Sequence, residues 1–389
     1  MQQPFAFLLA GLAYAACAPA EVELENVQSG PLQELERIRV HDRPDAVTTK
    51  DLNGDGRQDI IVGGDSVSIW LASQDGRWLS AQVEPYEAMA QALEFAFGDV
   101  NGDGHLDFVV AEHNAKEPQF LMWLGSASGS FELAPGNPFV VDATPHLHTI
   151  ALLDINQDGH LDVLTDSWPE NRLVWVAGQG DGKFALPGTQ IPVPPAPMQN
   201  LAVGDFDGDA QLDVVTPAHD REAVTLLLLQ GPGRFEQAPG SPFPSFGGFS
   251  TVACVDLNRD GHLDVLEVHR SDSSTQYKQD ALSILLGDGS GRLAHAPLSP
   301  HLDLPERSNT LAHGDVDGDG WIDVVVLGEI QKQLGLFLGS EEGLRTAGRN
   351  TVGGRARGLA AGNVLGDARA EILVTDFGSG EVILFGMEP

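Results

Sequence analysis

A nine-residue segment rich in aspartate recurs along the chain and limits the folds that the chain can adopt. The first copy, DLNGDGRQD, occupies residues 51–59. Successive copies begin 48 to 59 residues apart. A repeat period of about 50 residues is typical of repeat arrays and β-propellers, in which each repeat supplies one structural unit. The other copies occupy residues 99–107, 154–162, 205–213, 256–264 and 315–323, with a degenerate one at 363–371.

The shared pattern, D-x-D/N-x-D-G-x-x-D, provides oxygen-bearing side chains at positions 1, 3, 5 and 9 of each loop. Calcium takes six to eight oxygen ligands, and in loops of this kind position 7 contributes its backbone carbonyl. Glycine at position 6 allows a sharp turn because it tolerates positive φ. Without an ion, the neighbouring carboxylates would repel one another. The six intact loops therefore predict about six Ca²⁺ sites.

Each predicted site takes its ligands from positions 1, 3, 5, 7 and 9 of one loop. In chain order they are Asp51, Asn53, Asp55, Arg57 and Asp59; Asp99, Asn101, Asp103, His105 and Asp107; Asp154, Asn156, Asp158, His160 and Asp162; Asp205, Asp207, Asp209, Gln211 and Asp213; Asp256, Asn258, Asp260, His262 and Asp264; Asp315, Asp317, Asp319, Trp321 and Asp323.

Two of the seven loops depart from the pattern. The loop at 205–213 has Ala210 at position 6 but keeps four carboxylates, so we expect it to bind. The loop at 363–371 has Leu365 at position 3 and Ala368 at position 6, which should weaken or abolish binding.

An EF-hand is the first alternative, because it shares the first half of the pattern. It requires a bidentate glutamate at position 12 and a helix on either side. Only Glu267 meets the first requirement, and β-branched runs such as residues 59–62 and 323–326 follow the loops, which predicts buried strands. The second alternative is a set of Asp-Gly turns without an ion. Six copies in register favour metal binding over this alternative.

The loops and their flanks resemble a known family of repeats. Residues 201–209, followed by Leu212-Asp213-Val214-Val215, are similar to FG-GAP or VCBS repeats, which form integrin-α-type β-propellers and occur in many exported bacterial proteins. The resemblance covers nearly the whole chain after residue 28. It implies the propeller fold and calcium as the ion, and it implies no particular activity.

The repeat count predicts an all-β, seven-bladed propeller of four-stranded antiparallel blades. The seventh repeat contains only three strand signals, within residues 359–385. Gly30-Pro31-Leu32 has the spacing of the missing turn, and residues 35–40 have the pattern of a strand. We therefore expect residues 30–40 to complete the last blade and close the ring, which would remove two exposed sheet edges.

The charge balance excludes a nucleic-acid partner. Lysine and arginine number 22 against 56 acidic residues, a formal charge of −34, and no basic cluster interrupts the acidic sequence. Twenty of the acids lie in the six intact loops, so part of the acidity is explained by ligand chemistry.

The N-terminal residues predict export. Residues 4–18 are apolar but too few to span a bilayer, which fits a secretory signal. Ala15-Ala16-Cys17 is similar to a bacterial lipobox, and ordinary cleavage near Ala18 or Ala20 is the alternative. We expect a signal peptide or lipoprotein leader at 1–20, a tether at 21–28 and the propeller at 29–389. The mature protein is expected to be a periplasmic or cell-surface monomer that meets the membrane only through a lipid at Cys17.

The face opposite the calcium loops is where the sequence stops repeating, and loops on a rigid scaffold commonly carry function. Polar residues also gather in such loops without a function, which is the alternative interpretation of these residues. We expect a non-catalytic scaffold that binds a protein or carbohydrate there. The alternative is a polysaccharide lyase or another carbohydrate-active enzyme that uses the same residues. The candidate ligand contacts are His113, His148, Trp168, His219, His269, Arg270, Arg355 and Arg357.

Overall fold

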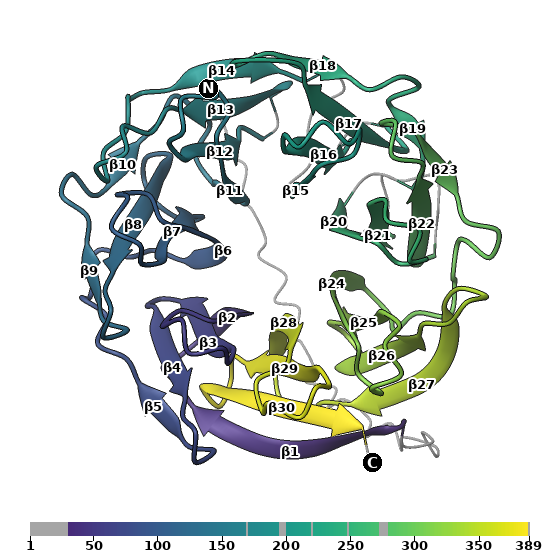
Figure 1. Ribbon diagram of the computed structural model, residues 1–389. Helices are drawn as coiled ribbons and strands as arrows, with labels where there is room; N and C mark the ends of the chain where they lie inside the picture. Colours follow the sequence, from purple (N-terminus) through teal and green to yellow (C-terminus); the bar gives the residue numbers. More distant parts are fainter. Residues whose placement is uncertain are drawn as a thin grey trace, which may run out of the picture.

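The computed structural model describes residues 30–168, 170–193, 200–218, 221–246, 249–271 and 279–387. Within these ranges the chain forms strands, turns and loops, and no helix is long and apolar enough to cross a membrane. The strands make seven antiparallel sheets arranged as blades around a central axis (Figure 1). The predicted seven-bladed propeller is confirmed.

In blades 1 to 6 the first strand lies nearest the axis and the later strands follow outward in sequence order, whereas in blade 7 the order outward is β28, β29, β30 and then β1. Blades 1 to 3 comprise β2 (Pro44–Lys50), β3 (Asp59–Gly64), β4 (Ser68–Ala72) and β5 (Trp78–Ser80); β6 (Ala92–Gly98), β7 (Asp107–Glu112), β8 (Gln119–Gly125), β9 (Phe131–Leu133) and β10 (Phe139–Val140); and β11 (Ile150–Leu153), β12 (Asp162–Asp166), β13 (Arg172–Val176) and β14 (Thr189–Pro192).

The remaining blades continue the same order around the ring. Blades 4 to 7 comprise β15 (Ala202–Gly204), β16 (Asp213–Pro217), β17 (Ala223–Leu229), β18 (Phe235–Gln237) and β19 (Phe243–Pro244); β20 (Phe249–Val255), β21 (Asp264–Arg270), β22 (Ala281–Gly287) and β23 (Leu293–His295); β24 (Ser308–Gly314), β25 (Asp323–Gly328), β26 (Gln333–Leu338) and β27 (Arg345–Thr351); and β28 (Ala356–Gly362), β29 (Glu371–Asp376), β30 (Glu381–Met387) and β1 (Leu32–Arg39).

The hydrophobic core lies between the blades. The second strand of each blade is buried along nearly its whole length, because a neighbouring blade covers each of its faces. The described residues form seven apolar clusters, and each joins two adjacent blades. This double coverage explains why the runs after the loops are continuously β-branched rather than alternating.

The outermost strand is interrupted in blades 2 and 4. In blade 2, β9 and β10 both pair with β8, and in blade 4, β18 and β19 both pair with β17. The interruptions contain Pro135-Gly136-Asn137-Pro138 and Pro239-Gly240-Ser241-Pro242. Proline lacks the N–H that a ladder needs, so the strand stops and resumes after the turn.

The two ends of the described chain close the ring, as predicted. β1 runs antiparallel to β30, with Leu32 opposite Met387 and Arg39 opposite Glu381, and the purple and yellow strands lie side by side in Figure 1. Leu32 and Ile38 are buried, at 5% and 6% exposed. The Asn350 side chain in blade 6 accepts a hydrogen bond from Leu32 N at 3.2 Å and donates one to Leu32 O at 2.6 Å.

Candidate functional site: cation loops and channel pocket

Every intact loop is held by the same backbone hydrogen bonds to its own acidic side chains. In the first loop, Asp51 accepts from Gly54 N and Gly56 N, each at 2.8 Å, and Asp55 accepts from Arg57 N at 3.0 Å. The bond from position 6 to position 1 and the bond from position 7 to position 5 recur in the other five intact loops. These bonds wind the chain tightly around one point, as the spacing predicts.

The tight winding requires positive φ at positions 4 and 6. Position 6 is glycine in five intact loops, and Ala210 adopts the same conformation in the loop of blade 4, with φ of 67°. Position 4, to which the sequence analysis gave no role, also has positive φ, even where it is Gln157 (60°) or Arg259 (61°). Left-handed backbone costs a non-glycine residue about 1–2 kcal/mol, so the loop geometry is kept against a local penalty.

Carboxylates from positions 1, 3 and 5 converge in two of the loops. One oxygen from each of Asp205, Asp207 and Asp209 lies within 4.8 Å of the other two, and Asp315, Asp317 and Asp319 are arranged in the same way. Burial and the nearby acids raise the pKa of Asp207 and Asp317. The other four intact loops have asparagine at position 3. Oxygen-only donors at this density suit a hard divalent cation such as calcium.

The acid at position 9 has a second role beneath the loop. Asp59 is 0% exposed, and it accepts from Leu52 N and from Ala72 N, each at 2.9 Å. It thereby ties the loop to the end of the third strand, and its counterparts in the other intact loops make the same two bonds. Burial raises the pKa of Asp59, Asp107, Asp213 and Asp323 to about 6.

The degenerate loop of blade 7 lacks one of the ligand positions of the intact loops. Leu365 supplies no side-chain oxygen, and the Arg369 guanidinium lies 2.7 Å from the Asp367 carboxylate. Arg369 also donates to Met387 O at 3.1 Å, next to the closing strand. Arg57 pairs with Asp55 in the same way in the first intact loop, so this ion pair does not set the degenerate loop apart. The missing oxygen at position 3 is the difference on which the expectation of weak or absent binding rests.

Replacing Asp107 with alanine is expected to destabilise the protein by about 2–5 kcal/mol even in chelator, because two buried N–H groups lose their acceptor. These groups are Val100 N at 2.9 Å and Gly125 N at 2.8 Å. Asp103→Ala in the same loop is the matched control. Its carboxylate is exposed, so its effect in chelator should stay below about 1 kcal/mol. Urea unfolding in EGTA measures the free energy of unfolding of both variants. Equal losses of stability would contradict the structural role of position 9.

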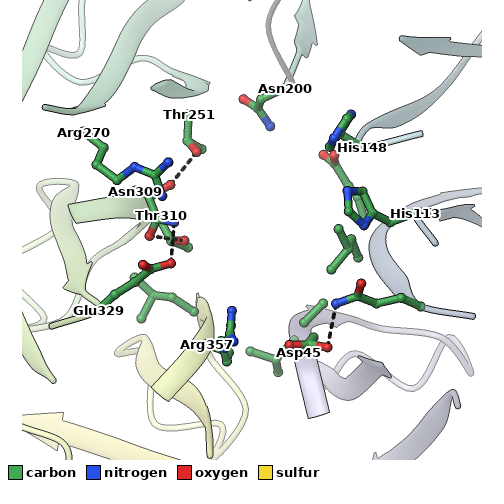
Figure 2. A pocket seen from close by; sticks show the side chains of 17 residues that line it. Asp45, His113, His148, Asn200, Thr251, Arg270, Asn309, Thr310, Glu329 and Arg357 are labelled. Carbon is green, nitrogen blue, oxygen red and sulfur yellow. Dashed lines mark hydrogen bonds between the residues drawn. The ribbon is translucent and has the colours of Figure 1, made fainter. Parts of the chain in front are cut away.

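The central channel contains a pocket of about 620 Å³ at the end opposite the cation loops (Figure 2). It is formed by the beginnings of the first strands and the ends of the second strands. The lining residues are Asp45, Ala46, Val47, Gln91, Leu93, Glu94, His113, His148, Asn200, Thr251, Arg270, Asn309, Thr310, Glu329, Arg357, Gly358 and Leu359. Its volume falls in the range of small-molecule sites, and most of its side chains are polar.

Four of the eight candidate ligand contacts line this pocket: His113, His148, Arg270 and Arg357. Figure 2 shows the two histidines on the wall across the channel from Arg270.

The other four candidates lie elsewhere. Trp168 packs edge-on against the His148 ring, with centroids 5.8 Å apart. Arg355 lies outside the lining, over the Phe377 ring. His269 is 0% exposed and stacks on Phe246, so this candidate does not face the channel. His219 lies outside the described residues, as does Cys17.

One wall of the pocket carries a histidine oriented by a buried acid. Asp166 accepts from His148 N at 2.8 Å and contacts His148 Nδ1 at 2.9 Å. The His113 ring lies 4.7 Å from the His148 ring. Burial and the neighbouring histidines lower the pKa of His113 to about 4, whereas burial raises the pKa of Glu94 to about 8. At neutral pH this wall therefore presents an uncharged imidazole and a protonated carboxyl that can donate a hydrogen bond.

Most of the pocket residues on or just before the first strands were not predicted from the sequence. Asp45, Glu94, Asn200, Thr251 and Thr310 all line the pocket. Each lies five or six residues before the first aspartate of its loop, as His148 does. This constant offset is the signal that could have found them, because an equal distance from seven equivalent loops corresponds to an equal height in the channel.

Comparison with known proteins agrees with this architecture. The family described as FG-GAP-like repeat matches residues 51–110, 99–165 and 154–216. Residues 51–216 carry FG-GAP-like repeats. Cartilage acidic protein 1 of Xenopus tropicalis is similar to this chain over 166 residues at 26% identity, and the human protein at 24%. Each match covers 40% of this chain, and the chain spans only about a quarter of the length of these curated relatives, 26% and 25%.

Solved structures share the fold of this chain at low sequence identity. BBS1N in complex with ARL6DN matches 92% of this chain and 98% of its own, with a TM-score of 0.58 and 12% identity. An Agrocybe aegerita lectin that recognises non-reducing terminal N-acetylglucosamine matches 86% of each chain, with a TM-score of 0.51 and 15% identity. The periplasmic gluconolactonase of Pseudomonas aeruginosa matches 80% of this chain and 86% of its own, with a TM-score of 0.54 and 16% identity. These similarities establish the fold alone.

Proposed function

We propose that this FG-GAP-like propeller is a calcium-stiffened, non-catalytic binding scaffold. Calcium binds in the six intact loops, and a ligand binds in the channel pocket at the opposite end. The observation that carries the proposal is the convergence of three carboxylates in each of two loops, at Asp205, Asp207 and Asp209 and at Asp315, Asp317 and Asp319. The other four intact loops have the same hydrogen-bond pattern, which supports extending the proposal of calcium binding to them.

Calcium titration of the purified protein tests the first half of the proposal. We expect six sites in the wild type and five in Asp103→Ala, because that substitution removes one position-5 ligand and leaves the other loops intact. Asp367→Ala in the degenerate loop is the matched control and should leave the stoichiometry at six. Isothermal titration calorimetry on protein freed of metal provides the count. A wild type that binds no calcium would overturn the proposal.

A carbohydrate-active enzyme, such as a polysaccharide lyase, is the second candidate. The observation that favours it is the His148–Asp166 pair, in which a buried acid orients an imidazole at the pocket wall, as in a general base. Incubation with uronic-acid polysaccharides, followed by ultraviolet absorbance of an unsaturated product, distinguishes an enzyme from a scaffold. Turnover that is lost in His148→Ala would favour the enzyme.

We further propose that the protein is exported, as a monomer at the cell surface or in the periplasm, with lipidation at Cys17 as its only membrane attachment. The leader pattern at residues 1–20 supports export. The partly exposed, acid-rich loops suit the calcium concentrations outside the cytoplasm, where modules with dissociation constants near 10⁻⁴–10⁻³ M are common.

A further inference from the structure

Three arginine side chains gather around one aromatic ring beside the channel pocket. The guanidinium carbons of Arg355, Arg43 and Arg357 lie 4.7, 5.0 and 5.4 Å from the centroid of the Phe377 ring. Phe377 follows β29, Arg355 directly precedes β28, Arg357 is the second residue of β28, and Arg43 directly precedes β2. We call Arg43, Arg355, Arg357 and Phe377 the arginine cluster. It lies where blade 7 meets blade 1, on the pocket side of the ring.

The cluster is unusual in a chain that carries 22 basic residues against 56 acidic ones. Three like charges around one ring repel one another, and the nearby acids neutralise them only in part. Arg43 pairs with Asp65 at 2.9 Å. Asp376 instead accepts backbone bonds from Arg355 N at 2.8 Å and Gly378 N at 2.9 Å.

Two guanidiniums of the cluster keep their capacity for an anion. Within the residues that the structure describes, no ion pair within 4.0 Å involves Arg355 or Arg357. Both side chains belong to exposed residues. Contact with the Phe377 ring weakly favours their present positions, which reduces in part the rotamer freedom that is lost on binding. Planar guanidiniums held in this way suit carboxylates, which they can bind through two parallel hydrogen bonds.

The cluster is continuous with the channel pocket, because Arg357 also lines that pocket. The rest of the lining suits a ligand with many hydroxyl groups better than an apolar ligand. Asn200, Thr251, Asn309 and Thr310 line it with amides and hydroxyls, and only Ala46, Val47, Leu93 and Leu359 are apolar. Thr251 donates to Asn309 O at 2.6 Å and Asn200 Oδ1 accepts from Val252 N at 2.7 Å, but a hydroxyl oxygen that donates can still accept from a ligand. The negative charge of two pocket acids is offset in part by arginines, since Arg357 and Arg43 lie near Asp45 and Arg307 Nε lies 3.8 Å from Glu329 Oε2. A ligand that carries many hydroxyl groups beside a carboxylate, as a uronic acid does, would match this lining.

We propose that the arginine cluster binds the carboxylates of an acidic oligosaccharide, one end of which enters the channel pocket. The inference rests on the proposed function and names its ligand class. Arg355 and Arg357 contact the carboxylates, Phe377 positions them, and the amide and hydroxyl side chains across the channel contact the sugar hydroxyls.

Calorimetry in saturating calcium tests the proposal with three probes: trigalacturonate, the neutral trisaccharide maltotriose and a triglutamate peptide. We expect trigalacturonate to bind at least tenfold more tightly than either of the others. Arg355→Gln and Arg357→Gln should each weaken trigalacturonate binding about tenfold, a typical effect for a hydrogen bond between charged groups. Phe377→Leu should weaken it several-fold and leave both guanidiniums in the protein.

Arg292→Gln is the matched control, since Arg292 is an exposed arginine in the turn before β23, at the cation-loop end. It makes the same change in net charge and should leave binding unchanged. Equal weakening by Arg292→Gln would overturn the inference, because the effect would then be one of overall charge. Equal affinity for triglutamate or maltotriose would also overturn it. In either case, an intact calcium stoichiometry would leave the proposed scaffold standing, whereas loss of calcium binding would overturn the proposed function itself.

Discussion

Removal of calcium is expected to lower the melting temperature of the protein by on the order of 10–20 °C. An ion held at a hundred times its dissociation constant stabilises the folded state by about 2.7 kcal/mol per site. Six such sites would add about 16 kcal/mol if they act independently. Calorimetric melting in calcium and in EGTA measures the difference.

The physical reason for so large an effect lies in the position of the loops. Each loop joins the first strand of a blade to its second, and its acids lie within a few residues of the buried strand, as with Asp315 and the run that begins at Asp323. Without a cation, the neighbouring carboxylates of the six intact loops repel one another, most strongly where three converge, at Asp205, Asp207 and Asp209 and at Asp315, Asp317 and Asp319. Magnesium is the control, because its smaller size and stricter octahedral geometry suit the loop poorly. A melting temperature that is the same with and without calcium would contradict the prediction.

Deletion of residues 30–40 is expected to destabilise the protein by on the order of 5–10 kcal/mol and to promote aggregation. The deletion removes the ladder between β1 and β30 and uncovers the apolar edge of β30, residues 381–387. Two buried side chains, Leu32 and Ile38, contribute about 1.5–3 kcal/mol each, and the ladder bonds contribute the rest. An exposed apolar edge is also a template for pairing with a second molecule.

Single substitutions distinguish the loss of ring closure from the general effect of deleting a segment of the chain. Ile38→Ala should cost about 2–4 kcal/mol, because Ile38 packs in the cluster between blades 7 and 1. Leu35→Ala, in the same strand, is the control and should cost less than about 1 kcal/mol, because Leu35 is 48% exposed. Urea unfolding gives both free energies, and light scattering reports the aggregation of the deletion variant. An unchanged melting temperature after the deletion would exclude closure by β1.

The fold could be predicted from the sequence because its information is local and repeated. Each Asp-rich loop marks the junction of a first and a second strand, so seven copies give seven blades without any knowledge of distant contacts. The closing strand could be found for a related reason, since one blade lacked a strand and Gly30-Pro31-Leu32 matched the missing turn. The split outer strands were not foreseen, although Pro138 and Pro242 carry the signal in the sequence.

The candidate site was harder to predict because side chains from all seven blades meet in it. Histidine and arginine stood out by their chemistry, yet chemistry alone did not separate His148, which lines the pocket, from His269, which is buried beside Phe246. Asn200 and Thr251 drew no notice because single polar residues on a strand are common. Only the assembled ring brings them to the same channel. The second role of position 9 was hidden for a similar reason, since its partner N–H groups, such as Gly125 N, lie beyond the loop.

The antiparallel pairing of β1 with β30 also determines how this domain can be joined to other polypeptides. Leu32 is registered opposite Met387, so the chain enters and leaves the ring at neighbouring points on its outer edge. A domain whose ends meet can be inserted into a surface loop of a host protein, or cut open at another turn after its ends are linked, with little distortion of either part. The propeller is therefore well suited to insertion into another protein, because the points at which it would be joined lie at the outer edge, away from the axial channel.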